Sequence, residues 1–280
     1  MTDLDRDLRA LSTESAASDF QFLDRMSVTE ILEIINRQDS MVASAVQAQL
    51  PRIAKVVEAA VEALNADGRI VYIGAGTSGR LGVLDAVECG PTFNAADRVV
   101  AVMAGGAAAL FVAVEGAEDD RNAARKDLAE IGLNKNDLLV GLAASGRTPY
   151  VIAGIEYARE LGCRTAGLSC NVGSELSSAA DIAIEVDTGP EVIAGSTRMK
   201  AATAQKMVLN MISSTAMVRI GKTFGNMMSD LRITNGKLLK RGVRIVAQVT
   251  GVPEEVAASV LESEGFDVRK AVQALAKESH

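Results

Sequence analysis

The sequence predicts an α/β fold, with a mostly parallel five-stranded sheet flanked by helices. Short runs rich in Val, Ile and Leu alternate with longer segments whose apolar residues recur three and four positions apart. Glycines and polar residues separate the two kinds of segment. This alternation is typical of parallel strands that are joined by helices covering both faces of the sheet.

The expected strands lie at 69–73, 98–104, 137–143, 164–169 and 181–186. Before the first strand, residues 28–65 have helical spacing throughout, with Pro51 breaking or restarting the pattern and Gly68 ending it. Helices are also expected at 80–88, at 109–132 with an interruption near Gly116, at 149–162 and, as a long helix, at 196–221.

After about Leu238 the strand signals cease, and three short helices separated by Gly251 and Gly265 form a compact appendage. We therefore expect three parts: an N-terminal helical segment at 1–54, a sheet domain at 55–235 and a C-terminal helical unit at 236–280. A chain of 280 residues suits such a main domain with a smaller one.

Composition narrows the classes of function. The net charge of −7 argues against a nucleic-acid-binding protein, which needs a basic face. No apolar run approaches the roughly 20 residues of a membrane span, and the N-terminus lacks the apolar core of a signal peptide, so a cytoplasmic location is expected. The three cysteines have no metal-like or disulfide-framework spacing, and the only histidine is His280, so neither a metal site nor a histidine base is expected.

The first expected strand runs into Gly74-Ala75-Gly76-Thr77-Ser78-Gly79, which satisfies the dinucleotide pattern G-x-G-x-x-G. A dinucleotide fold also needs an acid at the end of the second strand, and that strand ends in Val-Met-Ala-Gly-Gly. Thr77, Ser78 and Gly79 therefore indicate a site for a compact phosphate or for sugar hydroxyls at a helix N-terminus. The alternative is a tight turn whose glycines serve packing alone.

A second polar loop follows the third strand. Ser145, Gly146, Arg147 and Thr148 precede Pro149, which suits the first turn of a helix. Ligands of open α/β sheets bind outside the carboxyl ends of the strands, where this loop and the first one meet. Together the two loops predict a site for a phosphorylated small molecule.

A third polar cluster precedes the long helix. Ser196 is a candidate N-cap, and Arg198 and Lys200 then fall in the first turns. Cations there oppose the helix macrodipole, which favours an anion nearby and makes Ser196 and Lys200 candidate substrate contacts. Solvated surface cations are the alternative interpretation.

These pieces together resemble the sugar isomerase (SIS) domain, and four stretches resemble the N-acetylmuramic acid 6-phosphate etherases more closely: "GAGTSGRLGVLDAVECGPTF", "AVEGAEDD", "VGLAASGRTPYVIAGIEYARELGCRT" and "GPEVIAGSTRMKAATAQKMVLNM". The C-terminal helices are similar to a ubiquitin-associated (UBA)-like unit. One departure is Gly90, where the family usually has a second proline after the cysteine.

The resemblance implies a carbon–oxygen lyase of cell-wall amino-sugar recycling that converts N-acetylmuramate 6-phosphate to N-acetylglucosamine 6-phosphate and D-lactate. It places the family's two catalytic acids on Glu88 and Glu115, with Glu88 as proton donor and Glu115 as base. No metal or organic cofactor is required, and a homodimer is expected.

Taken without the resemblance, Glu88 and Glu115 would more often be solvated helix or helix-N-terminal acids than catalysts. Three rival functions also remain open. An aldose–ketose isomerase would share proton abstraction at C2 and release no lactate. A non-catalytic kinase regulator typically carries two SIS domains in a longer chain, and a transcription factor needs a basic recognition helix that neither terminus supplies.

Overall fold

The structure is a computed structural model that describes Thr13, Ser15, residues 21–228, 230, 233 and 235–278. The predictions about the extreme N-terminus and His280 fall outside these residues. A five-stranded sheet has the order β2-β1-β3-β4-β5, and every neighbouring pair is parallel. The strands are β1 (Ile70–Gly74), β2 (Val99–Met103), β3 (Leu138–Leu142), β4 (Arg164–Ser169) and β5 (Ile182–Glu185). The predicted α/β fold is confirmed, and each strand lies within one residue of its expected bounds.

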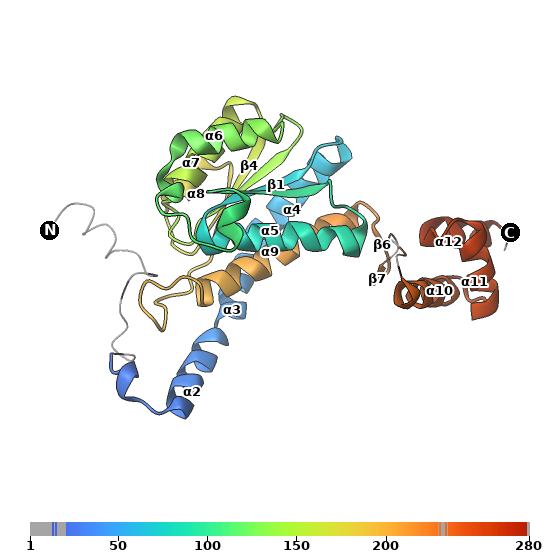
Figure 1. Cartoon of the computed structure of the whole chain (residues 1–280), viewed down its shortest axis with the longest axis horizontal. Helices are drawn as coiled ribbons and strands as arrows, with labels where there is room; N and C mark the ends of the chain where they lie inside the picture. The colour runs from blue at the N-terminus through green and yellow to red at the C-terminus, as the bar shows by residue number, and fades with distance from the viewer. Residues whose placement is uncertain are drawn as a thin grey trace.

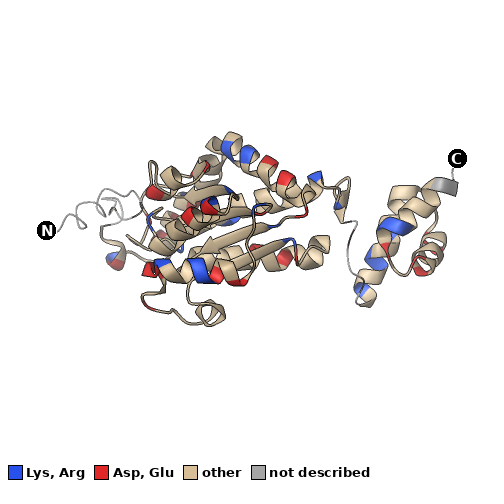
Figure 2. Ribbon diagram, turned by 90° about the horizontal axis from the view of Figure 1, so that it is seen from above, with Lys and Arg blue, Asp and Glu red and all other residues tan. Residues whose placement is uncertain are grey.

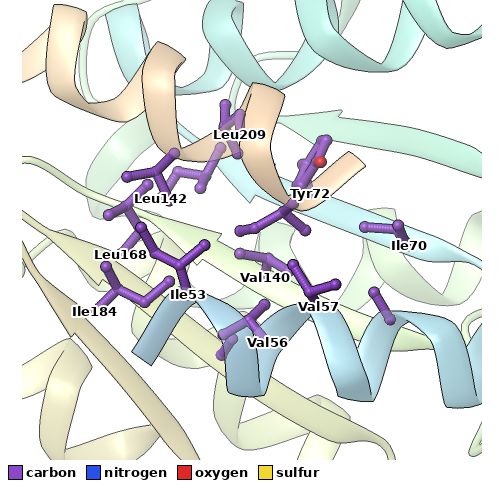
Figure 3. Close-up of a cluster of buried hydrophobic side chains, with 14 of the residues drawn as sticks. Ile53, Val56, Val57, Ile70, Tyr72, Val140, Leu142, Leu168, Ile184 and Leu209 are labelled. Atoms are coloured by element: carbon purple, nitrogen blue, oxygen red, sulfur yellow. The ribbon is translucent and has the colours of Figure 1, made fainter. Parts of the chain in front are cut away.

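Helices cover both faces of this sheet (Figure 1). One face carries α3 (Val42–Ala48), α4 (Leu50–Asn65), α5 (Gly76–Phe93) and α9 (Lys200–Arg219). The other carries α6 (Arg121–Glu130), α7 (Pro149–Glu160) and the short α8 (Glu175–Ala179). Figure 3 shows the first interface, where Val56 and Val57 of α4 meet strand residues such as Val140. Burial of both faces explains why the strands are apolar along their whole length.

The N-terminal stretch 28–65, expected to be helical with a break or restart at Pro51, forms three helices. α2 (Val28–Asp39) begins at a capping box, in which Ser27 and Glu30 exchange hydrogen bonds with each other's backbone N–H. The chain breaks after Asp39 and again at Gln49, and Pro51 lies in the first turn of α4. Pro51 therefore restarts the helix, as a residue without an N–H does best in a first turn.

The segment after β2 also differs from the prediction. Residues 109–132 were expected to be helical on either side of Gly116, but before Gly116 only a 3-10 turn forms, at Ala107–Leu110. A second 3-10 turn at Ala117–Asp119 leads into α6, which Asp120 caps through the N–H groups of Asn122 and Ala123. The irregular stretch 111–116 carries Glu115 over the end of the sheet.

The C-terminal unit contains the three expected helices, α10 (Gly236–Thr250), α11 (Glu254–Ser263) and α12 (Val268–Glu278). They form their own apolar cluster, and Phe224, Met227 and Met228 of an unexpected hairpin, β6 (Thr223–Phe224) with β7 (Met227–Met228), pack against it. The boundary between 235 and 236 stays a prediction. Acidic and basic residues are interspersed along the ribbon (Figure 2). No helix of the described residues is long and apolar enough to cross a membrane.

Candidate active site at the carboxyl edge of the sheet

Loops after β1, β3 and β4 meet at one edge because these strands are parallel neighbours. The β3 and β4 loops are joined directly: Cys170 N–H donates to the Ala144 carbonyl at 2.9 Å, and Leu176 N–H donates to the Gly146 carbonyl at 2.9 Å. Gly146 has φ +70°, and a Cβ there would lie 2.3 Å from the Ser174 Cβ. Position 146 therefore requires a glycine, because any side chain there would collide with the loop that follows β4.

The β1 turn opens directly into α5. The first N–H groups of α5 have no intrahelical acceptor, and the N-cap Ala75 has only a methyl group, which cannot accept a hydrogen bond from them. This arrangement suits an anion at the helix N-terminus. The packing explanation for the glycines also holds, since a Cβ on Gly79 would lie 2.8 Å from the Gly74 carbonyl oxygen. The Gly79 N–H already donates to the Ala75 carbonyl, so the open donors are those of Gly76, Thr77 and Ser78.

A cavity of about 240 Å³ lies at this helix N-terminus and contains Glu115 in its wall. Its lining also includes Ala75 and Gly76 of the β1 turn and the partly buried Arg80. Arg80 donates through Nε and Nη2 to the carbonyls of Leu110 and Ala109, at 3.1 and 2.7 Å. Glu115, one of the two glutamates assigned by the resemblance, thus lies beside the β1 turn. Arg80 also lies there and holds residues 109 and 110, just before the stretch that carries Glu115.

The predicted hydroxyls have different surroundings. Ser78 is buried, and its Oγ donates to Gln205 Oε1 at 2.9 Å, while the Gln205 Nε2 is buried without a partner in the described residues. Thr77 is half-buried. If the Gln205 amide turned over, its Nε2 would donate to Ser78 and release the Ser78 proton for an anion. Ser78 and Gln205 therefore act as one hydrogen-bonded pair.

In the second predicted loop, Ser145 Oγ accepts the Arg147 N–H at 3.2 Å and keeps its own proton available. Thr148 is the N-cap of α7, yet its side chain makes no capping bond. The Gly146 N–H donates to the Ala143 carbonyl and is already used. The two hydroxyls, rather than the Gly146 amide, are therefore candidate donors of this loop, and the Arg147 guanidinium stays a predicted contact.

The third cluster is built differently from the prediction. α9 begins at Lys200, not Ser196. Among the described residues, Ser196 makes only backbone hydrogen bonds, in the turn before the helix. The cap is the buried carboxylate of Glu191, which accepts the N–H groups of Lys200 and Ala201 at 3.0 and 2.9 Å. The anion expected at this helix N-terminus is thus a side chain of the chain itself.

Lys200 is also placed differently from the expectation of a surface cation beside the substrate. The residue is 1% exposed, and its Nζ donates to Gln38 Oε1 on α2 at 2.9 Å in a partly buried hydrogen bond. Burial lowers the pKa of Lys200, while the carboxylates of Glu191, Asp39 and Asp187 act in the opposite direction. Lys200 thus ties α9 to α2.

Glu88 is exposed and lies in the interior of α5, which continues to Phe93 where the sequence predicts an end near Glu88. Twelve residues separate Glu88 from Gly76, which corresponds to about 18 Å along a helix. The exposed apolar residues Leu84 and Val87 flank it. Within one chain, α5 therefore carries Glu88 away from the cavity that Glu115 lines.

One turn before Glu88, a buried polar network joins α5 to β1 and α9. Asp85 accepts the Tyr72 hydroxyl at 2.9 Å and the Ser213 hydroxyl at 3.2 Å. With its amide oriented to suit its neighbours, Asn210 donates to Asp85 at 3.1 Å and accepts from Lys206 at 2.9 Å. Burial raises the pKa of Asp85 above 3.8, while hydrogen bonds from Tyr72 and Ser213 and the charge of Lys206 oppose the shift.

Comparison with known proteins gives a consistent assignment. The family model "Glucokinase regulatory protein N-terminal SIS domain" matches residues 52–159. N-acetylmuramic acid 6-phosphate etherases from Geobacillus thermodenitrificans and Cronobacter sakazakii are 50% and 52% identical over 266 residues, which is 95% of this chain and 90% of each relative. The chain belongs to the N-acetylmuramic acid 6-phosphate etherases. It is accordingly a carbon–oxygen lyase with an SIS domain.

Solved structures agree on the fold of this etherase. The phosphoheptose isomerase from Francisella tularensis aligns with a TM-score of 0.54 at 19% identity, covering 68% of this chain and 98% of its own. The enzyme of the same name from Neisseria gonorrhoeae gives 0.53 at 16% identity, with the same coverage. At these identities the likeness concerns the SIS fold alone.

The Tyr150 hydroxyl and the Cys89 thiol of the etherase are poorly suited to act as bases. Tyr150 donates to Asp127 at 2.7 Å, and burial, with that hydrogen bond and charge, raises the pKa of its hydroxyl. Burial raises the pKa of Cys89 to about 12. The cysteines are free and buried, and the described residues contain no cluster of three or more His, Cys, Asp or Glu that could hold a metal.

Four site residues were not predicted from sequence: Arg80, Gln205, Glu191 and Asp85. Arg80 lies in the quoted etherase motif and Gln205 lies in the quoted α9 motif, but neither carries a local signal of its partner, because each partner comes from a distant segment. Gly90 continues α5, and a Cβ there would lie 3.2 Å from the Ala96 Cβ. The departure from the family's proline thus leaves the helix intact next to Glu88.

Proposed function

We propose that the chain cleaves the D-lactyl ether of N-acetylmuramate 6-phosphate, giving N-acetylglucosamine 6-phosphate and D-lactate. The observation that carries the proposal is the identity of about half the residues, over 95% of the chain, with etherases that bear this substrate in their name. The setting would be the cytoplasm, in the recycling of cell-wall amino sugars.

In this scheme the open-chain aldehyde makes the C2 proton acidic. A carboxylate takes that proton, the lactyl oxygen leaves C3 with a proton from a carboxylic acid, and water adds to the conjugated aldehyde. One ionised and one protonated carboxyl are needed at the same time, and carboxyls in different environments can supply both. We assign Glu115 as the base and Glu88 as the acid. The scheme requires neither a metal nor an organic cofactor.

The phosphate would bind at the N-terminus of α5 and the β3 loop. Candidate donors are the hydroxyls of Thr77, Ser78, Ser145 and Thr148, and the guanidinium of Arg147. The uncapped first turn of α5 supports this placement, because its N–H groups favour an anion. Gly79 and Gly146 would contribute by leaving no side chain in the way of close backbone contacts. They would not donate hydrogen bonds to the phosphate, since both N–H groups have backbone partners. Ser196 and Lys200 remain candidate substrate contacts only in an indirect sense. Ser196 lies in the turn before α9, and Lys200 begins that helix.

The separation of the two glutamates supports a homodimer. C2 and C3 of the sugar are bonded neighbours, so the base and the acid must act within one sugar ring. Glu88 lies about 18 Å along α5 from the turn beside Glu115. We infer that each site combines Glu115 and the loops of one chain with Glu88 of a second chain. A two-fold pairing builds two such sites at once.

The test is release of D-lactate when the purified protein is incubated with N-acetylmuramate 6-phosphate. Loss of substrate without lactate would instead support an isomerase, and binding without turnover would support a regulator. For the shared site, inactive Glu88→Gln and Glu115→Gln chains are mixed after separate purification. Mixed dimers are expected to recover part of the parental activity, because one of their two sites has both acids. Recovery in neither equimolar nor unequal mixtures would contradict sharing.

A further inference from the structure

Arg80 is a cation without a charged partner in the cavity that contains Glu115. Its Nε and Nη2 donate to the carbonyls of Leu110 and Ala109, at 3.1 and 2.7 Å. Within the described part of the chain, no carboxylate forms an ion pair with Arg80, and this includes Glu115. The remaining N–H groups of the guanidinium lie on its end, on Nη1 and Nη2. That end can donate two parallel hydrogen bonds to a carboxylate.

The lining of this cavity gives an anionic group one cation to meet. Arg80 is the only cation among the described residues that line it, whereas Glu115 and Glu118 are acids. The other lining residues are small or apolar, such as Met103 and Ala113. A bound carboxylate would be repelled by the two glutamates unless it lay against Arg80. The cavity thus offers one cation for a charge and apolar side chains for a methyl group.

The proposed substrate has two anionic groups, which lie at different ends of the sugar. The phosphate is on C6, and none of its candidate donors, which include Ser78, Ser145 and Thr148, lines this cavity. The lactyl carboxylate is four bonds from C2, so it comes within a few ångströms of the base that takes the C2 proton. With Glu115 as that base, the lactyl carboxylate lies in the cavity that Arg80 lines.

We propose that Arg80 binds the lactyl carboxylate and so determines specificity for N-acetylmuramate 6-phosphate over sugar phosphates that have no lactyl group. The guanidinium keeps its hydrogen bonds to the carbonyls of residues 109 and 110 while its open end takes the carboxylate. Arg80 also offsets the repulsion between the substrate carboxylate and Glu115. The inference rests on the proposed lyase function and names the contact that recognises the leaving group.

The test is calorimetric titration of Arg80→Gln in the Glu115→Gln background, in which the substrate is not turned over. The ligands are N-acetylmuramate 6-phosphate and N-acetylglucosamine 6-phosphate, which differ only in the lactyl group. Loss of the ion pair should weaken binding of the first ligand by about ten-fold or more and change binding of the second by less than about two-fold. Arg244→Gln removes the same charge from an exposed position of α10 and should change neither affinity.

A change in the ligand isolates the charge of the lactyl group. The carboxamide of N-acetylmuramate 6-phosphate has nearly the same shape but is neutral, so Arg80→Gln should weaken its binding far less than that of the acid. Arg80→Lys keeps a charge but loses the planar fork, and its affinity for the acid should lie between those of Arg80→Gln and the parent. Equal effects of Arg80→Gln on the acid and the carboxamide, or no effect on either, would overturn the assignment.

The remaining outcomes distinguish this inference from the proposed function. If Arg80→Gln weakens both sugar phosphates equally, Arg80 serves the phosphate or the loop that carries Glu115, and the specificity assignment fails while the lyase reaction stands. If the wild-type protein releases no D-lactate, the proposed function fails, whereas the titrations still decide whether Arg80 recognises the carboxylate. Should Arg80→Gln not fold, Arg80→Lys carries the same comparison, with a larger loss of affinity expected for the acid than for the carboxamide.

Discussion

At the scale of single residues, four carboxylates in and around the candidate site have four different surroundings. Glu115 lines a cavity, Glu88 is exposed on a helix, Glu191 caps a helix and Asp85 is buried in a network. The catalytic roles of Glu88 and Glu115 stay predictions that rest on family resemblance, since nothing in the spacing of these residues separates them from surface acids. Asp85 and Glu191 carry no local signal, because their partners lie far away in the chain.

Removing one carboxyl at a time separates the two proposed half-reactions. Glu88→Gln keeps hydrogen bonding but cannot donate a proton as an acid, so we expect lactate release to fall roughly a hundred- to ten-thousand-fold. Exchange of the C2 hydrogen with deuterated water should continue, because it needs only the base. Glu115→Gln should lose exchange and elimination together. Parental lactate release by Glu88→Gln, or normal exchange by Glu115→Gln, would refute the corresponding role.

The phosphate assignment is tested by the double variant Ser145→Ala, Thr148→Ala. Each lost hydroxyl is expected to weaken substrate binding by about 1–3 kcal/mol, because a charged partner loses a donor. Calorimetric titration with the catalytically silent Glu115→Gln background gives the affinity without turnover. Thr203→Ala is a suitable control, since the exposed Thr203 hydroxyl bonds only to the Met199 carbonyl of its own helix. Unchanged affinity in the double variant would place the phosphate elsewhere.

The buried Asp85 predicts a pH dependence of stability. Burial raises its pKa above 3.8 in the folded protein, so the folded state binds the proton more tightly than the unfolded chain does. The contribution of Asp85 to the free energy of unfolding should therefore decrease as the pH rises from 3.8 through the raised pKa. Asp85→Asn cannot titrate, so the stability of the wild type relative to this variant should fall over that range. Urea unfolding at several pH values measures this difference, and a rise with pH would contradict the assigned shift.

At the scale of elements, apolar periodicity located the five strands to within one residue, because buried parallel strands are apolar throughout. Apolar periodicity predicted the bounds of helices less well, because contacts with distant segments decide where those helices begin and end. The stretch 28–65 has helical spacing but breaks into three helices, and residues 111–116 follow the surface although their composition suits a helix. The start of α9 was also misplaced, since the Ser196 signal is local whereas Glu191 acts from nine residues before Lys200.

The capping of α9 allows the carboxylate of Glu191 to be compared directly with the hydroxyl of Ser196. Glu191→Ala removes the acceptor of two N–H groups and a charge beside the buried Lys200, so it should lower the free energy of unfolding by about 2 kcal/mol. Ser196→Ala should have little effect on stability, because the structure uses only the backbone of Ser196. Chemical denaturation of both variants measures the two values. A larger effect for Ser196→Ala would restore Ser196 as the cap.

At the scale of the whole molecule, the sheet domain and the C-terminal unit have separate apolar clusters, and few contacts connect them. The three C-terminal helices were predictable from the loss of strand signals after Leu238. The role of residues 223–228 was not, because two residues per strand are too few to give a periodic pattern. Their side chains belong to the cluster of the C-terminal unit.

Asp230 forms ion pairs that connect the end of α9 to this unit. It accepts from Lys222, just after α9, and from Arg269 of α12, both at 2.8 Å, and Arg269 also donates to the Gly221 carbonyl. Burial alone would raise the pKa of Asp230, but hydrogen bonds and charges of Lys222 and Arg269 outweigh it and lower the pKa below 3.8. Its stabilising contribution is therefore present at neutral pH and is lost as the pH falls through the lowered pKa.

Asp230→Asn is expected to loosen the C-terminal unit without unfolding either apolar cluster. Trypsin should cut more rapidly between Arg219 and Lys237 in this variant than in the wild type, while the far-ultraviolet circular dichroism stays the same. Glu262→Gln removes one negative charge from an exposed position of the same unit and should leave the cleavage rate unchanged. Equal cleavage of the Asp230→Asn and wild-type proteins would mean that apolar packing of the β6–β7 hairpin, rather than the Asp230 ion pairs, holds the unit in place.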